Sequence, residues 1–197
     1  MSIKSLMRVN FIKLFSYLSS SNKSKVIFYH DIHSNSVYTD MSTPIDVFIQ
    51  HIKIIRDLGY QIVSKIDNPI GQIEISFDDG FKGIYNNLCV IKDLNIPIQV
   101  FCISSKISEG DSNYLNHNEL IEMNLLSNIK IGSHTHTHND LTLLSEENVS
   151  FELKRSRDIF YELLDLKVDS ICFPYGRFNN KVVQASIDLG YIDLYSS

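Results

Sequence analysis

The sequence predicts an α/β fold built on a parallel sheet of about seven strands, either open or closed into a barrel. Two observations support this prediction. Short apolar, β-branched runs alternate along the chain with longer segments that have the spacing of amphipathic helices. Polar and metal-capable side chains directly follow several of the predicted strands, and parallel strands bring their carboxyl ends to one edge of a sheet. We therefore expect these side chains to form one functional site.

Size and composition indicate a single globular domain. The 197 residues are enough to bury a proper core, and 44% hydrophobic with 21% charged residues is ordinary for a soluble protein. A net charge of −5 provides no basic surface, so nucleic acid is not expected as a partner. The three cysteines include no CxxC pair, and Cys102 and Cys172 are expected to be buried as small apolar residues.

Residues 1–25 are predicted to form an amphipathic helix and a polar linker ahead of a domain at residues 26–197. Apolar residues recur at helical spacing within residues 4–18, with basic residues among them. No run reaches the roughly 20 apolar residues of a membrane span, and Lys13 interrupts any signal-peptide core. We expect this helix to pack on the domain itself, with peripheral membrane contact as the alternative. The predicted location is the cytoplasm or the cytoplasmic membrane face, and the oligomeric state stays open.

Strands and helices alternate through the rest of the chain. The predicted strands cover residues 26–30, 60–63, 73–77, 96–103, 129–133, 169–175 and 191–195. The predicted helices cover residues 45–58, 84–94, 116–126, 145–166 and 179–189. For the first of these helices, Thr43 is the expected N-cap, Pro44 supplies a first-turn proline, and Gly59 ends the helix. The polar residues 104–113 are predicted to be a loop.

Apolar spacing also predicts which helix residues face the core. In the helix at residues 45–58 these are Ile45, Phe48, Ile49, Ile52, Ile55 and Leu58. In the helix at residues 145–166 they are Phe151, Ile159, Phe160, Leu163 and Leu164.

Asp78 and Asp79 follow the predicted strand at residues 73–77 and precede Gly80. Taken alone, Asp-Gly is more often a tight turn than a site. Adjacent carboxylates after a strand nevertheless point in different directions, so one can bind a metal ion while the other faces the bound water. Zinc lowers the pKa of such a water toward about 7, which allows a nearby carboxylate to remove its proton.

Three histidines follow the strand at residues 129–133. A single histidine is more often structural than a ligand, but three within five residues favour metal binding. His134 and His138 share one side if the segment is helical, whereas His136 joins them on one face if it is extended. The residues alone leave both arrangements open. One carboxylate and two imidazoles leave coordination positions free, as a catalytic metal site requires.

Three motifs occur in a characteristic order: SFDDG at residues 76–80, GSHTHTHNDL at 132–141 and FPYG at 173–176. Together they resemble the motifs of the NodB-homology polysaccharide deacetylases, carbohydrate esterase family 4. The resemblance spans the chain from about residue 26 onward. It implies a distorted (β/α) barrel that removes acetyl groups from glycans with a divalent metal ion, usually Zn²⁺.

The resemblance also implies residue roles. Asp78 corresponds to the general base, and the metal ligands correspond to Asp79, His134 and His138. Pro174, Tyr175 and Gly176 match the segment that lines the substrate groove, where the backbone N–H of Tyr175 stabilises the oxyanion.

The expected general acid is His30. The family's usual acid is a histidine near the C-terminus, but no histidine follows His138 in this chain. The poly-N-acetylglucosamine deacetylase type, to which the chain is most similar, uses a histidine in an early Tyr-His pair. Tyr29 and His30 match that pair, which implies that His30 protonates the leaving amine. A structural role at the strand end is the alternative for His30.

Two departures from the family pattern bear on activity. The arginine that commonly precedes Pro-Tyr-Gly is replaced by Cys172 and Phe173, and Arg177 after the motif is a candidate substitute. Relatives usually continue beyond the strand that begins at residue 191, which predicts a minimal form, a fragment or a degraded copy.

The sequence thus predicts a metal-dependent hydrolase acting on N-acetylated amino sugars of a glycan, through metal-bound water and Asp78. The alternatives are a non-catalytic glycan-binding relative and an amide hydrolase with a small substrate.

Overall fold

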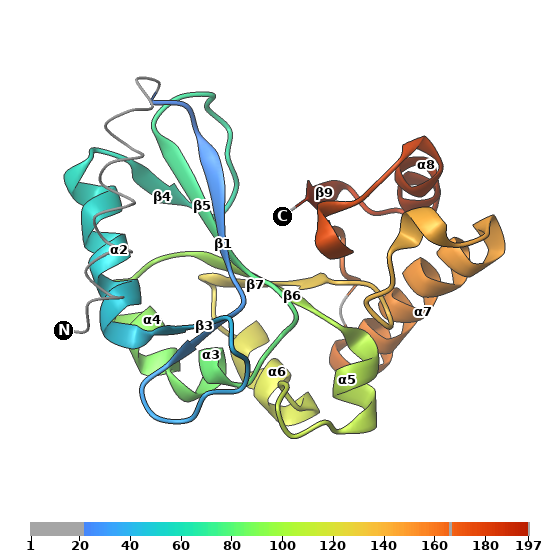
Figure 1. Ribbon diagram of the computed structural model, residues 1–197, viewed down its shortest axis with the longest axis horizontal. Helices are drawn as coiled ribbons and strands as arrows, with labels where there is room; N and C mark the ends of the chain where they lie inside the picture. The colour runs from blue at the N-terminus through green and yellow to red at the C-terminus, as the bar shows by residue number, and fades with distance from the viewer. Residues whose placement is uncertain (1–21, 166, 197) are drawn as a thin grey trace.

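A curled sheet of seven parallel strands forms the centre of the molecule (Figure 1). The computed structural model describes residues 22–165 and 167–196, so the helix predicted within residues 4–18 lies outside the described part. The strands are β1 (Lys25–Tyr29), β4 (Gln61–Val63), β5 (Gln72–Phe77), β6 (Ile98–Cys102), β7 (Ile129–Ser133), β8 (Ser170–Phe173) and β9 (Asp193–Ser196). Their order is β1-β5-β6-β7-β8-β9, with β4 also beside β5. The fold is the predicted distorted (β/α) barrel.

β5 pairs with three other strands, whereas a strand inside a regular barrel pairs with two. β1 pairs along one edge of β5, from Lys25 opposite Ile73 to Tyr29 opposite Phe77. β4 and β6 must therefore share the other edge, and they do so at different heights. β4 pairs with residues 72–74, whereas β6 pairs only with Ser76 and Phe77. Because neighbours cover β5 on both edges and both faces, every one of its residues is buried.

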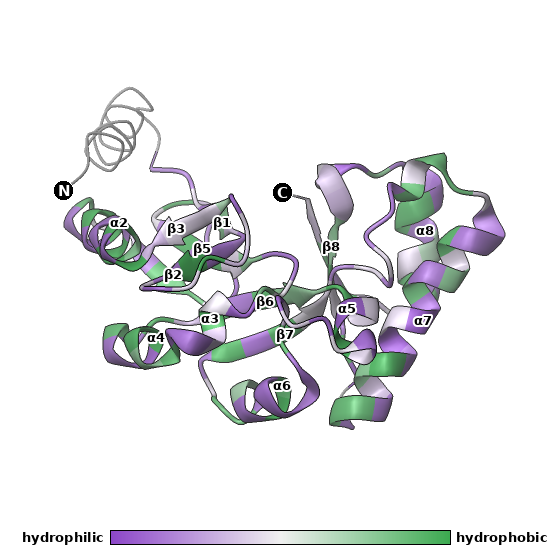
Figure 2. Cartoon of the chain, turned by 60° about the horizontal axis from the view of Figure 1, so that its bottom comes forward, coloured by the Kyte–Doolittle hydropathy of each residue, from purple (hydrophilic) through white to green (hydrophobic). Residues whose placement is uncertain are grey.

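The helices surround this sheet, and Figure 2 shows green and purple segments alternating around α2 and α7 as expected for amphipathic helices. The α-helices are α2 (Ile45–Asp57), α3 (Gly83–Asn86), α4 (Leu88–Leu94), α5 (Ser104–Glu109), α6 (His117–Asn124), α7 (Glu146–Leu164) and α8 (Asn180–Asp188). Two short 3₁₀ helices, η1 (Leu141–Leu143) and η2 (Pro174–Gly176), lie near the carboxyl ends of the strands. Among the described residues, no helix combines the length and apolar character needed to cross a bilayer.

Some local expectations were wrong. The residue preceding α2 is Pro44, without a side-chain cap, so Thr43 is not the N-cap. Ile49 on α2 and Leu58 directly after it are exposed, and Phe151 is exposed on α7. The buried face of α2 includes His51 and Ile54, so it is rotated about the helix axis relative to the predicted face. Cys102 and Cys172 are buried as predicted.

Three short elements were also missed. Residues 104–109 form α5 instead of a loop, and the small strands β2 (Asp31–His33) and β3 (Ser42–Pro44) follow β1. Strands of three residues are too short to show a periodic pattern. β2 and β3 are held by a tertiary contact, in which the buried Ser42 hydroxyl donates to Asp31 Oδ2 at 3.0 Å.

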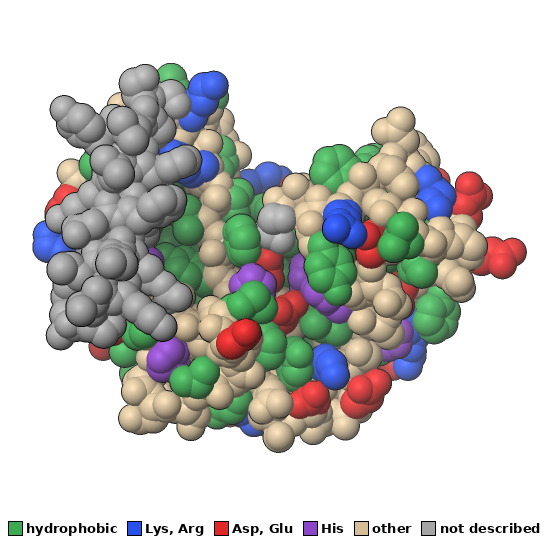
Figure 3. Space-filling model, in the orientation of Figure 1, with side chains coloured by type: hydrophobic (Ala, Val, Ile, Leu, Met, Phe, Trp, Pro, Cys, Tyr) green, Lys and Arg blue, Asp and Glu red, His purple; other side chains and the backbone are tan. Residues whose placement is uncertain are grey.

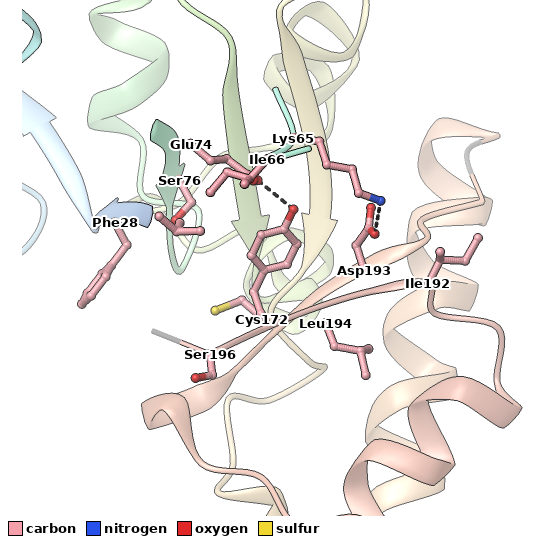
Figure 4. A pocket seen from close by; sticks show the side chains of 12 residues that line it. Phe28, Lys65, Ile66, Glu74, Ser76, Cys172, Ile192, Asp193, Leu194 and Ser196 are labelled. Carbon is pink, nitrogen blue, oxygen red and sulfur yellow. Dashed lines mark hydrogen bonds and ion pairs between the residues drawn. The ribbon is translucent and has the colours of Figure 1, made fainter. Parts of the chain in front are cut away.

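The sheet is open between β1 and β9, where a trough of about 490 Å³ lies along the barrel wall (Figure 4). Tyr195 donates a hydrogen bond to Glu74 Oε1 across its inner wall at 2.7 Å. Phe28 and Cys172 also line the trough. Phe28 is the next-to-last residue of β1, so the trough reaches the carboxyl edge of the sheet.

Candidate metal centre and active site

Three metal-capable side chains meet at the carboxyl edge of the sheet. Asp79 follows β5, and His134 and His138 follow β7. Their potential ligand atoms all lie within 4.8 Å of one another. Asp79 Oδ1 is 3.5 Å from His134 Nε2 and 3.4 Å from His138 Nε2. In the space-filling view, histidine and acidic side chains gather below the hollow between the two sides of the open barrel (Figure 3).

The Asp-Asp-Gly segment is both a tight turn and part of the site. Asp79 has a φ of 69° and Gly80 a φ of 81°, and the Gly80 N–H donates to the Asp78 carbonyl. A Cβ on Gly80 would lie 2.8 Å from Cys102 Sγ, so β6 leaves room only for glycine. This turn separates the directions of the two adjacent carboxylates.

His134 is oriented by its second ring nitrogen. Nδ1 lies 2.8 Å from the Cys172 carbonyl oxygen, which can only accept, so Nδ1 carries the proton. Nε2 therefore presents a lone pair toward Asp79, which is the tautomer that a metal ligand needs. The side chain is only 2% exposed, and burial lowers its pKa to about 3. His134 is thus neutral at neutral pH.

The charges of the cluster also suit a cation. Burial lowers the pKa of His138, opposed by the nearby carboxylate of Asp79. Burial raises the pKa of Asp79, opposed by the positive charges that His138 and His30 can carry. A divalent cation would stabilise the ionised carboxylate and accept the lone pairs of two neutral imidazoles, so these residues fit a metal ion.

The structure brings together His134 and His138 but not His136. The His136 Nδ1 is 3.0 Å from the Ser104 hydroxyl, and its ring meets the Phe151 ring edge-on. Between the two arrangements left open by the sequence, the fold selects the pair four residues apart.

Asp78 lies beside the cluster with only 1% of its surface exposed. The Cys172 thiol points at its Oδ2 from 3.8 Å, at the place where an arginine was expected. Arg177 does not substitute for that arginine. It donates to Asp140 Oδ2 at 2.7 Å and lies over the Tyr175 ring.

The remaining predicted residues lie around the same edge. His30 follows β1, and its charge would lower the pKa of Asp79, which requires proximity. Tyr175 has a φ of 58° within η2, and its ring meets the His138 ring at a centroid distance of 4.8 Å. Tyr175 is 62% exposed, whereas Pro174 before it is buried and Gly176 after it is half-buried. The sequence motifs are thus gathered on one face.

A protein-family model described as polysaccharide deacetylase matches residues 65–192. The chain belongs to the polysaccharide deacetylase family. It is 26% identical over 180 residues to the candidate polysaccharide deacetylase YxkH of Bacillus subtilis (strain 168), covering 86% of this chain and 62% of YxkH. The chain therefore spans 62% of the length of that relative.

Solved structures of deacetylases have the same fold. The Streptococcus pyogenes deacetylase PplD in complex with acetate superposes with a TM-score of 0.75 at 23% identity, covering 87% of this chain and 82% of PplD. IcaB from Ammonifex degensii superposes with a TM-score of 0.78 at 21% identity, covering 89% of this chain and 84% of IcaB. These comparisons confirm the resemblance to the NodB-homology deacetylases.

Within this member of the polysaccharide deacetylase family, the matched range contains both acidic residues, the histidine pair and the Pro-Tyr-Gly segment. His30 precedes the matched range, so its position near the cluster comes from the structure alone. Sequence reasoning did not identify Glu152, a buried carboxylate of α7. It accepts backbone N–H groups of residues 134–138, which we call the histidine loop. The only available signal was a charged residue on the core-facing side of an amphipathic helix.

Proposed function

We propose that this protein is a metal-dependent deacetylase that removes acetyl groups from N-acetylated amino sugars of a glycan. The observation that carries the proposal is the cluster of Asp79, His134 and His138, whose ligand atoms lie within 4.8 Å of one another. Asp78, next to Asp79 in the chain, supplies a second carboxylate. Zn²⁺ suits this donor set, because two imidazoles and one carboxylate leave coordination positions open. Membership of the polysaccharide deacetylase family supports the substrate class.

Each residue has a task in hydrolysis of the amide. A Zn²⁺ ion in this site would supply Lewis-acid chemistry, polarising the acetyl carbonyl and making water more acidic. Asp78 takes a proton from the attacking water, whose oxygen forms a bond to the acetyl carbon. The Tyr175 N–H donates to the carbonyl oxygen as negative charge develops there. As the C–N bond breaks, His30 gives a proton to the nitrogen, and the products are acetate and a free amine.

Asp78→Asn is expected to lower acetate release by at least about 10²-fold while the purified protein still binds zinc. The substitution removes the basic oxygen but leaves Asp79 and the histidine pair in place. The measurement is acetate release from N-acetylglucosamine oligomers, together with zinc content after dialysis against zinc. Asp158→Asn on the exposed face of α7 is the matched control and should keep the wild-type rate.

The double variant His134→Ala/His138→Ala is expected to lose the roughly one zinc per chain of the wild type. Full activity of the Asp78→Asn variant would refute the assignment of the base. A folded wild-type protein that binds no zinc would refute the metal-dependent mechanism. Glycan binding without acetate release would then identify a non-catalytic relative.

A further inference from the structure

The loop that carries the two clustered histidines has a conformation that must be held from outside. Thr135 and His138 have φ values of 67° and 62°. Left-handed backbone is unfavourable for residues other than glycine, and a β-branched residue such as Thr135 rarely adopts it. Such residues persist only where the surrounding structure fixes them.

α7 supplies the fixing contacts through Glu152. This carboxylate is only 4% exposed. Its Oε2 accepts the backbone N–H groups of His136 at 3.0 Å and Thr137 at 2.8 Å, and its Oε1 accepts the Thr137 hydroxyl at 2.5 Å. Hydrogen bonds to a charged acceptor are roughly twice as strong as neutral ones, so a single side chain restrains two successive peptide groups.

A second residue of α7 acts at the start of the loop. Ser156 follows Glu152 by four residues and therefore lies on the same face of the helix. Its hydroxyl is 2.8 Å from the Ser133 hydroxyl, which in turn accepts the Thr135 N–H at 3.1 Å.

The opposite side of the loop is held by α5. The N–H groups of Ser104 and Ser105 donate to the carbonyl oxygens of Thr135 and His136. With the carbonyls bound by α5 and the N–H groups bound by α7, the loop is fixed from both sides. This arrangement also explains why α5 forms although its own sequence did not predict a helix.

We propose that Glu152 is a positioning residue, which sets the spacing of His134 and His138 and thereby the affinity and geometry of the metal site. The inference rests on the proposed metal-dependent function. Glu152 acts through the backbone of this loop. Its hydrogen bonds go to the N–H groups of His136 and Thr137 and to the Thr137 hydroxyl, not to the rings of His134 and His138. Loss of its hydrogen bonds should allow the strained loop to relax and move His138 away from Asp79.

Glu152→Met tests this directly, because the side chain is similar in length but offers no oxygen acceptor to the N–H groups of His136 and Thr137. Outer contacts of metal ligands are typically worth 10–100-fold in metal affinity. We expect the zinc dissociation constant of the variant, measured by competition with a chelator, to rise at least about 10-fold. The visible absorption spectrum of the Co²⁺-substituted protein should also change, since it reports coordination geometry and not merely a folded state.

Glu162→Met is the matched control, since it makes the same change at an exposed position of α7. Its zinc affinity and Co²⁺ spectrum should equal those of the wild type. If Glu152→Met fails to fold, Thr137→Val replaces it, because that change removes the hydroxyl bond to Glu152, together with one from the exposed Asn139 side chain, and should weaken zinc binding in the same direction.

Two results separate failure of this inference from failure of the proposed function. Wild-type zinc affinity and an unchanged Co²⁺ spectrum in a folded Glu152→Met variant would overturn the positioning role alone. Absence of zinc binding in the folded wild type would overturn the metal site, and with it both proposals.

Discussion

Asp78 and Asp79 are neighbours in the sequence with different surroundings in the structure. Asp79 shares its space with two histidines, whereas Asp78 faces the Cys172 thiol. The left-handed backbone at Asp79 directs the two carboxylates apart, which allows one to bind a cation and the other to act as a base. The sequence could indicate this division from the pair and its glycine. It showed Cys172 in place of the expected arginine, but it could not predict that the thiol would point at Asp78 Oδ2.

His30→Ala is expected to reduce deacetylation of an N-acetyl sugar by about 10²–10⁴-fold without loss of zinc. An amine is a poor leaving group unless it is protonated, so removal of the acid should affect amide cleavage most. In an acetyl ester of an acidic phenol, the phenolate leaves without a proton. The variant should therefore hydrolyse such esters at nearly the wild-type rate. The measurement is the rate on both substrates, together with zinc content.

His33→Gln is the control for this test, because that residue lies at the end of β2, close to His30 in the sequence, but its Nδ1 pairs with the Ser42 hydroxyl at 2.9 Å. A loss of zinc in His30→Ala would instead make His30 a ligand. Equal losses on amide and ester substrates would contradict the role of an acid.

At the scale of elements, helices with local signals began where the sequence predicted them. Ser145 caps α7 by accepting the Asn148 N–H, and Asn179 caps α8 in the same way. α5 was missed because its stability depends on contacts with the histidine loop, which is distant in sequence. The helix predicted at residues 84–94 is interrupted at Asn87, whose side chain donates to the carbonyls of Gly83 and Ile32.

Gly132 in β7 illustrates an element whose packing fixes the site. A Cβ at this position would lie 2.6 Å from Phe101 Cδ1 and 2.8 Å from Gln99 Nε2. Gly132→Ala is expected to lower the free energy of unfolding of the metal-free protein by about 1–3 kcal/mol, because β6 cannot make room without repacking. Equilibrium denaturation in urea measures this loss.

A double-mutant cycle with Phe101→Leu identifies the cause. If the clash with the ring is responsible, the alanine should cost less in the Phe101→Leu background than in the wild type. Strictly additive effects would contradict this explanation.

At the scale of the whole molecule, alternation of strands and helices was enough to predict a parallel sheet and the convergence of the motifs. It did not determine whether the barrel closes. Nor did it predict the register at β5, where β4 and β6 share one edge at different heights, because this register has no counterpart in hydrophobic periodicity. The trough between β1 and β9 is lined by Phe28 and Cys172, and the Cys172 thiol also points at Asp78 Oδ2.

The buried carboxylate of Asp31 links the loop after β1 to the rest of the fold, and its ionisation should affect global stability. Burial raises the pKa of Asp31 to about 6, against hydrogen bonds from Ser42 and from the backbone N–H groups of Ile32, Gly83 and Ile84, which lower it. An aspartate in an unfolded chain has a pKa near 3.9, so the folded state binds more protons between these values. The contribution of Asp31 to stability is therefore fully present below about pH 4 and is lost as the pH rises through about 6.

Asp31→Asn removes this titration, whereas all other groups titrate in both proteins and cancel in the comparison. A shift of about two units corresponds to roughly 3 kcal/mol. The free energy of unfolding of the metal-free variant, relative to the metal-free wild type, is thus expected to rise by up to roughly 3 kcal/mol between pH 4 and pH 7. Urea denaturation at a series of pH values measures the difference. A difference that stays constant across this range would show that Asp31 ionises alike in the folded and unfolded chains, and that the loop carrying His30 is held by contacts that do not depend on its charge.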